Sequence, residues 1–420
     1  MGSRIEKLLP EIAWITDEAL RGQAGHRRLF GCPGKPLRIL VISFSDLRSD
    51  ARVFRQLNAL RRRHRVECVA YTDPGLPDVT VHVAQGRVPG YREKLKELPL
   101  LALRRYDAYE RRFAHGDLRL PGVMPGGYDV VLCNDANALP YGFSVCGDAP
   151  VVFDAHEYSP RQYEDVWIWR LFFRPYKEWL CRTYLPRLGG MVTVSEGIAE
   201  AYARNFGVPQ PQVVTNAADY VELSPSEMVP GKIRLVHHGI CAPSRHIDRM
   251  LDAMALLDDR FSLDLFLVPG PPRRYFDAMI SRAEALPRVR IRPPVPLGDV
   301  VSTLREYDGG MYILPPSNFN HAHALPNKFF DFVQARLMVA IGPSPEMGRL
   351  VRQHQLGVVG EDFSPEALAA RLRELTLEQV RVYKENSHRA ARELSSETNM
   401  AVLERVLEEA ARGRSAGAIW

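Results

Sequence analysis

Residues that could carry chemistry gather where short apolar runs give way to polar residues. His156 and Glu157 follow the run VVFDA, and Asp135 follows VVLCN. Asp50 and Arg52 come soon after LRILVIS, within SDLRSDARV. If these runs are parallel strands of an open α/β sheet, such residues lie at the edge where these sheets bind ligands. We therefore predict that His156 faces a cleft and has a functional role, whereas Asp50 could instead cap a helix.

Positive charges stand at two predicted helix starts in the second half of the chain. Arg245 precedes a helix after a strand predicted to end at Gly239, and Lys328 lies within HALPNKFFDF. A Lys at a helix start fits the helix dipole poorly, unless something negative lies nearby. Free N–H groups at helix starts bind anions, and Arg adds a charged fork. We therefore predict a phosphate-binding site that uses Arg245 and Lys328.

The sequence lacks the motifs of several common ligand-binding sites. No G-x-G-x-x-G follows the first strand and no G-x-x-x-x-G-K-[ST] occurs, which counts against a dinucleotide oxidoreductase and a P-loop hydrolase. The six cysteines form no C-x-x-C pair, so we expect neither a zinc site nor disulfides. No apolar signal region or run of eighteen apolar residues occurs, and we expect a cytoplasmic protein.

Apolar runs that alternate with helical periodicity predict a doubly wound α/β fold in two domains. A chain of 420 residues with 46% hydrophobic and 25% charged residues can form two cores. The predicted strands are residues 37–43, 66–71, 128–134, 149–155, 189–195, 232–239, 262–270, 289–295, 309–315 and 337–343. The predicted parts are an N-terminal extension (1–35), a first domain (36–215), a linker (216–231), a second domain (232–385) and a helical segment (386–420).

The net charge of +5 is concentrated in the first half of the chain. Residues 87–113 carry eight Lys or Arg against four Asp or Glu, and residues 161–187 carry six against three. The second segment includes the aromatic stretch WIWRLFFRPYKEWLCRTYLPR, residues 167–187. Core packing with a solvated basic edge is one interpretation, and peripheral contact with an anionic membrane or a lipid phosphate is the other. No nucleic-acid-binding module accompanies the charge, so we expect no nucleic acid partner.

Eight sequence elements, taken in order over roughly residues 37–385, resemble the retaining glycosyltransferases of family four. They are DARVFRQLNAL, YDVVLCNDANALP, VVFDAHEY, VTVSEGIAEAY with VVTNAADY, HHGICAPSRHIDRMLDAM, RPPVPLGDVVSTLREYDGGMYILPP, HALPNKFFDF and GVVGEDFSPEALAARLREL. The resemblance implies the GT-B fold, in which two Rossmann-like domains face each other across a cleft. It implies transfer of a sugar, with retention, from a UDP- or GDP-type donor to a saccharide, lipid-linked or small-molecule acceptor. No cofactor is implied, and no Asp-x-Asp motif follows a strand, so we expect metal-independent transfer.

The resemblance also implies roles for individual residues. His156 matches the cleft histidine of the family. Two departures stand in the donor site: the usual pair of Glu residues is replaced by His323 and Asp331, and Ile240 replaces the Arg expected after Gly239. The predicted donor-binding residues are Gly239, Arg245, His323, Ala324, Leu325, Asn327, Lys328 and Asp331, and the predicted acceptor-side residues are Asp50, Arg52, Asp135 and Glu157.

Two alternatives to a transferase stay open at this point. A nucleotide-sugar epimerase of the same architecture would need more carboxylates in the cleft and no acceptor. A non-catalytic subunit that binds nucleotide sugars is favoured by the missing second phosphate cation and by His323.

Overall fold

The computed structural model describes residues 35–84, 91–114 and 122–415, and within it the chain from Pro36 onward forms one compact unit. The predicted N-terminal extension, residues 1–35, lies outside the described residues apart from Lys35.

The first half of this unit is built on a parallel sheet of seven described strands, in the order β3-β2-β1-β4-β5-β6-β7. The central strands are buried along almost their whole length, because helices cover both faces. The strands are β1 (Arg38–Ile42), β2 (Arg65–Ala70), β3 (Val79–Val83), β4 (Val130–Asn134), β5 (Val151–Ala155), β6 (Gly190–Thr193) and β7 (Gln212–Val213). The sequence did not predict β3 and β7, since β3 is a half-exposed edge strand and β7 has only two residues.

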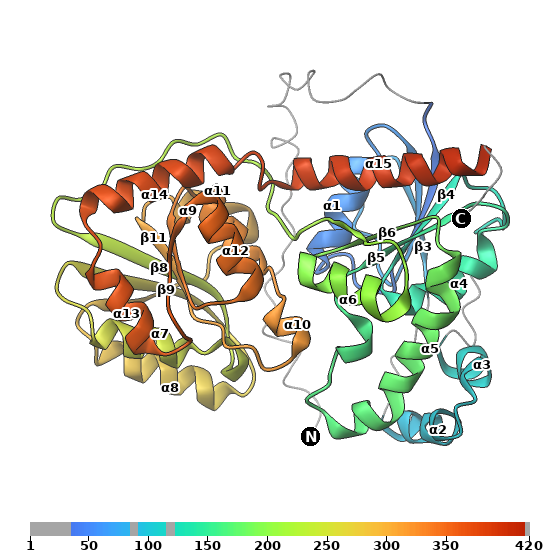
Figure 1. The fold of residues 1–420 in the computed structure, drawn as a ribbon, viewed down its shortest axis with the longest axis horizontal. Helices are drawn as coiled ribbons and strands as arrows, with labels where there is room; N and C mark the ends of the chain where they lie inside the picture. The colour runs from blue at the N-terminus through green and yellow to red at the C-terminus, as the bar shows by residue number, and fades with distance from the viewer. Residues whose placement is uncertain (1–34, 85–90, 115–121, 416–420) are drawn as a thin grey trace. The chain divides into compact units, whose positions relative to one another are not determined.

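The helices of the first half connect these strands (Figure 1). They are α1 (Ala51–Leu60), α2 (Tyr91–Ala102), α3 (Tyr106–Tyr109), α4 (Leu139–Val145), α5 (Arg174–Tyr184) and α6 (Glu196–Phe206). A π-helical turn, η5 (Trp169–Phe173), runs directly into α5.

The second half has a parallel sheet of six described strands, in the order β10-β9-β8-β11-β12-β13. These strands are β8 (Ile233–Cys241), β9 (Phe261–Pro269), β10 (Val289–Arg292), β11 (Gly309–Tyr312), β12 (Met338–Ile341) and β13 (Gly357–Val359). The strand predicted to end at Gly239 continues to Cys241, where it still pairs with β9. Two parallel sheets with interleaved helices confirm the predicted α/β class.

The helices of the second half flank this sheet (Figure 1). They are α7 (Ile247–Ala255), α8 (Arg273–Glu284), α9 (Val300–Leu304), α10 (Phe319–Ala322), α11 (Asn327–Gln334), α12 (Pro345–His354), α13 (Pro365–Arg373) and α14 (Leu377–Ala390).

The last described helix, α15 (Ser396–Ser415), packs on the sheet of the first half rather than the second. Figure 1 shows it in red beside β4 and β6, whereas α14 lies against the other sheet. Its apolar residues Leu403 and Leu407 are fully buried in the cluster that contains Ile39 and Val41 of β1. The C-terminal helical segment therefore completes the core of the first half.

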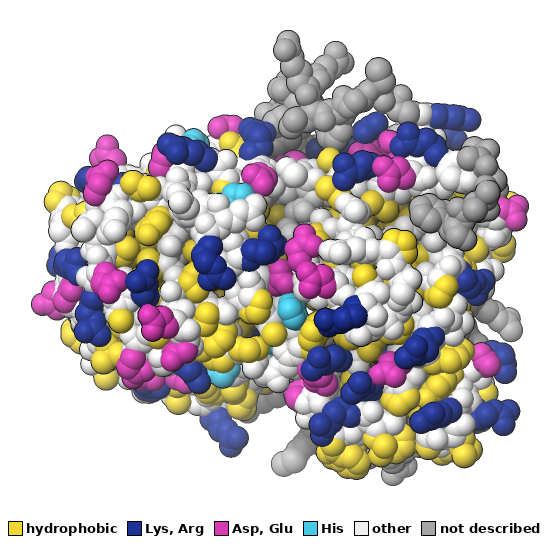
Figure 2. Space-filling view, viewed as in Figure 1, with side chains coloured by type: hydrophobic (Ala, Val, Ile, Leu, Met, Phe, Trp, Pro, Cys, Tyr) yellow, Lys and Arg dark blue, Asp and Glu magenta, His cyan; other side chains and the backbone are white. Residues whose placement is uncertain are grey.

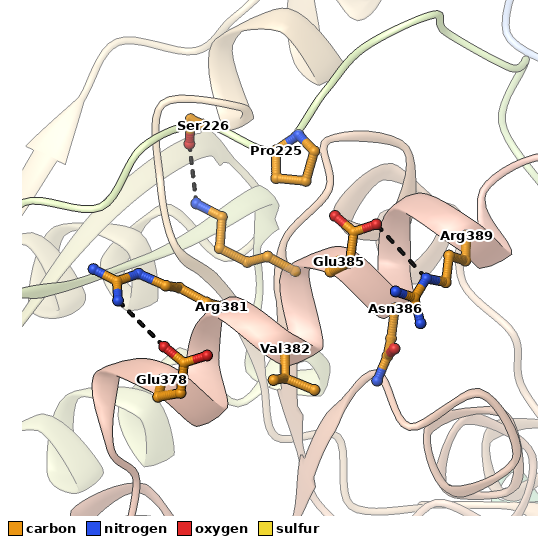
Figure 3. A pocket seen from close by; sticks show the side chains of 9 residues that line it. Pro225, Ser226, Glu378, Arg381, Val382, Glu385, Asn386 and Arg389 are labelled. Carbon is orange, nitrogen blue, oxygen red and sulfur yellow. Dashed lines mark hydrogen bonds and ion pairs between the residues drawn. The ribbon is translucent and has the colours of Figure 1, made fainter.

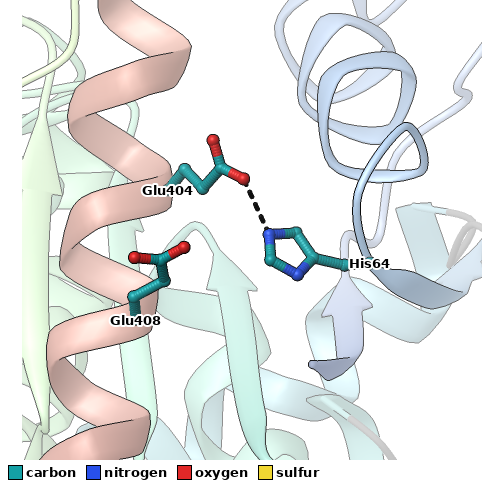
Figure 4. Close-up of side chains that lie close together, drawn as sticks. All are labelled: His64, Glu404 and Glu408. Atoms are coloured by element: carbon teal, nitrogen blue, oxygen red, sulfur yellow. Dashed lines mark hydrogen bonds and ion pairs between the residues drawn. The ribbon is translucent and has the colours of Figure 1, made fainter. Parts of the chain in front are cut away.

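Charged side chains also fix α15 to the first half. Glu404 of α15 lies 2.8 Å from Nε2 of His64 (Figure 4). It also lies 2.9 Å from the guanidinium of Arg63. The backbone N–H of Leu37 donates to Nδ1 of His64, which places the imidazole proton on Nε2, facing Glu404. His64, Glu404 and Glu408 are close enough together to hold a metal ion, but Arg63 already pairs with both carboxylates. We interpret the cluster as an ionic anchor for α15.

Candidate functional site

His156 follows β5 and is held by polar residues at the carboxyl ends of β4 and β5. Its Nε2 lies 2.9 Å from Oδ1 of Asn134 and 3.6 Å from Asp154, and its Nδ1 lies 3.7 Å from Asp135. Burial alone would lower the pKa of His156, but the carboxylates of Asp135 and Asp154 raise it to about 9. His156 is therefore positively charged at neutral pH, and its side chain is 20% exposed.

Asp154 is the buried charge that orients this site. It is fully buried in β5 and accepts two hydrogen bonds from Arg52, at 2.8 and 2.7 Å, and another from Gln56. Burial would raise the pKa of Asp154, but Arg52 and His156 hold it well below its ordinary value. A buried carboxylate of this kind is stable only when its partners neutralise it.

Asp50 and Arg52, which were predicted on the acceptor side, both have hydrogen-bond partners within the fold. Asp50 caps α1, since Oδ1 accepts from the N–H of Val53 and Oδ2 from the hydroxyl of Ser45. Arg52 is only 7% exposed, and beyond Asp154 it donates to the carbonyl oxygen of Val214. Asp50 thus stabilises the start of α1, and Arg52 holds the carboxylate of Asp154 in place.

Asp135 and Glu157 lie on the open side of His156. Asp135 is 47% exposed and adopts a positive φ of 64°, which is strained for a non-glycine residue. Burial and the neighbouring Asp135 raise the pKa of Glu157 to about 7. Lys177 of α5, itself buried, donates to Asn137 at 2.7 Å. This side of the site thus offers carboxyl and amide groups that suit the hydroxyl groups of a polar acceptor.

Lys328 is brought against the backbone of Gly239 in the second half. Gly239 has φ 114°, and a Cβ there would lie 3.3 Å from Nζ of Lys328. Nζ lies 3.2 Å from Nε2 of His237 and 4.3 Å above the ring of Tyr312. Since Nδ1 of His237 hydrogen-bonds the carbonyl of Met311, Nε2 is the acceptor for Lys328.

Arg245 lies close enough to Lys328 for their charges to interact. Burial and the positive charge of Arg245 lower the pKa of Lys328 to about 7, although Asp331 opposes this. Arg245 also acts on Tyr312, where it opposes the rise in pKa that burial causes. The charges of the two predicted cations therefore repel each other near the end of β8, and a phosphate would relieve this repulsion.

Asp331 lies one turn after Lys328 on α11. Its Oδ2 is 3.3 Å from Nε2 of His238, and its side chain is 13% exposed. Arg55 of α1 is partly buried, which lowers its pKa, while Asp219 and Asp331 oppose the change. The sequence gives no signal for Arg55, because its pattern is that of any polar residue in a helix.

The remaining predicted donor-binding residues, in the loop before and at the start of α11, differ in burial and in hydrogen-bond partners. His323 is 23% exposed, and its Nδ1 lies 3.1 Å from Oε1 of Glu346. Leu325 packs in the core, and the N–H of Ala324 bonds the carbonyl oxygen of His321. Asn327 is exposed at the first position of α11.

Sequence reasoning missed Asp154, His237 and Glu346. An Asp inside the apolar run VVFDA, and a His inside the strand around VHHG, were signals of buried polar partners. Glu346 follows β12 at the start of α12, in the same relation to its strand as the predicted residues. Its contact with His323 is tertiary and has no sequence signature.

A groove of about 370 Å³ lies elsewhere, between α14 and residues 225–226 (Figure 3). Its charged side chains are paired with one another: Arg381 with Glu378 and Arg389 with Glu385. Lys384 is bound by Asp308 and by the hydroxyl of Ser226. This groove offers an anion no unpaired charge, so we place the candidate site at the strand ends.

The first half of the chain matches a known protein family. Residues 51–221 match the family model described as Glycosyltransferase Family 4. No curated protein sequence gives a significant match.

Solved structures of glycosyltransferases share the fold of the whole unit. A glycosyltransferase from Rickettsia africae is 11% identical, with a TM-score of 0.64 over 90% of this chain and 99% of that one. Sucrose-phosphate synthase from Thermosynechococcus elongatus is 13% identical, with a TM-score of 0.65 over 89% and 98%. HepE from Anabaena, solved with UDP and glucose, is 15% identical, with a TM-score of 0.60 over 89% and 99%. These likenesses confirm the predicted GT-B fold.

Proposed function

We propose, from the premise that this chain is a glycosyltransferase with a family 4 domain and the GT-B fold, that it transfers a sugar from a nucleoside diphosphate to an acceptor hydroxyl with retention. The second half binds the donor and the first half binds the acceptor. The placement of Lys328 against Gly239, with Arg245 close enough for its charge to act on Lys328, carries this proposal.

The donor site suits a diphosphate for electrostatic reasons. Lys328 loses part of its charge in the free protein because burial and Arg245 disfavour it. A diphosphate would supply the missing negative charge and can approach closely at Gly239, which has no side chain. Asp331 lies one turn further along α11, and its carboxylate would accept hydrogen bonds from ribose hydroxyls. The solved complexes of HepE with UDP-glucose support a nucleotide-sugar donor.

The catalytic role proposed for His156 is to orient the donor sugar and stabilise developing charge. A pKa near 9 keeps the imidazole protonated, so it cannot serve as a general base at neutral pH. In a retaining reaction on one face of the sugar, the leaving phosphate can accept the proton of the acceptor hydroxyl. Arg245 and Lys328 would stabilise that phosphate, and we propose that no metal ion is needed.

Nucleotide release with UDP-, GDP- and TDP-sugars, with and without candidate acceptors, tests the proposal. We expect acceptor-dependent release with one class of donor, and a product with the anomeric configuration of the donor. Conversion of the donor without any acceptor would instead indicate an epimerase. Tight binding with neither release nor conversion would indicate a non-catalytic subunit.

We also propose that the acceptor site opens towards an anionic membrane surface. Apolar side chains are exposed close together before α5: Trp167 is 63% exposed, Leu171 59% and Tyr163 54%, followed by Val166 and Ile168. We call these five residues the apolar patch. Other aromatic residues of the same stretch pack inward, as the core-packing interpretation expects: Trp169 is 9% and Tyr176 2% exposed.

Basic residues lie near the apolar patch. Arg170 and Arg174 are exposed beside it, and exposed Arg104 and Arg105 lie at the end of α2, which packs on the π-helical turn. Figure 2 shows hydrophobic side chains among Lys and Arg over the region where Figure 1 places α2 and the start of α5. Apolar side chains within a basic rim suit the interface of an anionic bilayer. No described helix is long and apolar enough to cross a membrane.

Flotation with liposomes tests the membrane contact. We expect the protein to float with vesicles that contain an anionic lipid, and not with neutral ones. A variant with Trp167→Ser and Leu171→Ser should stay in the soluble fraction. Val382→Ser is the matched control, because Val382 is 47% exposed on α14. Equal flotation of all three proteins would contradict the proposal.

A further inference from the structure

His323 is held on three sides by described residues. Its ring packs against Phe319 at 4.5 Å between centroids, and its Nδ1 lies 3.1 Å from Oε1 of Glu346. The third side is the backbone of Gly197, where any Cβ would clash with the imidazole. The imidazole is therefore fixed in position, although 23% of the side chain remains exposed.

Glu346 is the group that determines which nitrogen of His323 carries the proton. Its side chain is 5% exposed, and Oε1 also accepts a 2.8 Å hydrogen bond from the N–H of Gly197. Burial would raise the pKa of Glu346, but the hydrogen bonds from His323 and Gly197 lower it overall, so the group is a carboxylate at neutral pH. A carboxylate can only accept, so Nδ1 of His323 must donate.

The other ring nitrogen is left as a hydrogen-bonding group. Among the described residues no hydrogen bond reaches Nε2 of His323. His323 stands between β11 and α11, in the loop that leads to Lys328 five residues later. In the neutral imidazole with its proton on Nδ1, Nε2 is an acceptor. A fixed acceptor in this loop suits a hydroxyl group better than a phosphate, because a phosphate has no proton to donate at neutral pH.

We propose that Glu346 is a positioning residue that holds His323 in the Nδ1–H tautomer, so that Nε2 accepts a hydrogen bond from a hydroxyl group of the transferred sugar. This inference rests on the proposed function and adds the means by which the sugar is recognised. It also gives Gly197 a role, since only glycine leaves room for the pair.

The tautomer can be measured without any substrate. Long-range ¹H–¹⁵N spectra of protein labelled at histidine distinguish the two ring nitrogens, and the His323 signals are assigned by their loss in His323→Ala. We expect the Nδ1–H tautomer in the wild type and in Glu346→Gln, which keeps an acceptor oxygen. Glu346→Met removes the acceptor and should release the Nε2–H form. An Nε2–H tautomer in the wild type would overturn the proposal.

Steady-state kinetics can distinguish a positioning role of Glu346 from a purely structural role. Glu346→Met should lower kcat/KM for the donor about 10-fold, the value of one hydrogen bond, while the affinity for UDP stays unchanged. Glu346→Gln should stay within about 3-fold of the wild type. Glu164→Met is the matched control, because Glu164 binds the same loop through the N–H of Phe319 without touching His323. If the control loses as much kcat/KM as Glu346→Met, the effect is structural and the proposal fails.

A second substitution should restore the activity that a first substitution removes. His323→Glu supplies another acceptor, but it places two carboxylates in contact, so the single variant should be poorly active. Adding Glu346→Gln removes one charge and should restore activity. No restoration would argue against the shared site. A wild type with the Nδ1–H tautomer that binds no UDP-, GDP- or TDP-sugar would overturn the proposed function, and with it the sugar contact.

Discussion

Lys328 titrates near neutral pH in the free protein, and donor binding should follow this titration. Burial and Arg245 lower the pKa of Lys328 to about 7, whereas a bound diphosphate favours the charged ammonium. The free protein is then half protonated at about pH 7 and about 1% protonated at pH 9. If only the protonated form binds well, the affinity falls about 50-fold over this range, which is roughly 2 kcal/mol.

Isothermal titration with the preferred nucleotide sugar measures this effect. The diphosphate of a nucleotide sugar does not titrate near neutral pH, so the change reports on the protein. At pH 8 about 0.9 proton should be taken up per donor bound, which comparison of buffers with different ionisation enthalpies reveals. Lys328→Met should bind weakly with no pH dependence, and Lys328→Arg should stay charged and lose the dependence. An affinity that is constant from pH 7 to pH 9, without proton uptake, would show that protonation of Lys328 does not control donor binding.

Further predictions concern Arg52, His156 and Gly239. Arg52→Met leaves the buried carboxylate of Asp154 without its ion pair, so urea unfolding should show a loss of about 3–5 kcal/mol. Because Arg52 and His156 hold the pKa of Asp154 low against its burial, wild-type stability should be complete above about pH 4 and decline as the pH falls further. His156→Ala should lower kcat about 100-fold or more with little change in nucleotide affinity, and wild-type kcat at saturating donor should fall as the pH rises through about 9. Gly239→Ala strains a backbone at φ 114° and crowds Lys328, so calorimetry should show weaker donor binding with an unchanged fold by circular dichroism.

The sequence predicted most of the fold, because buried parallel strands are continuous apolar runs that local composition reveals. It missed the edge strand β3, which is half-exposed, and the short strands β7 and β13. It placed α15 in a helical segment but not on the sheet of the first half, since the match between Leu407 and β1 depends on the path of the chain.

The sequence predicted only those residues of the candidate site that lie near strand ends. His156, Asp135 and Glu157 lie together after β4 and β5, and the charge of Arg245 acts on Lys328 near Gly239. Arg52 pairs with Asp154, because that buried carboxylate needs neutralisation, whereas Asp50 caps α1. Partners that come from distant elements, such as Glu346 for His323, follow from tertiary packing and leave no local pattern.

The diphosphate site at the end of β8 can be tested by acceptor-dependent release of the nucleoside diphosphate, measured in parallel for the wild type, Arg245→Ala and Arg290→Ala. Arg290 is exposed on β10 and serves as the matched loss of one positive charge. We expect release by the wild type and by Arg290→Ala, and loss of both donor binding and release in Arg245→Ala. Donor binding and release that survive in Arg245→Ala at the wild-type level would contradict the placement of the diphosphate at the end of β8.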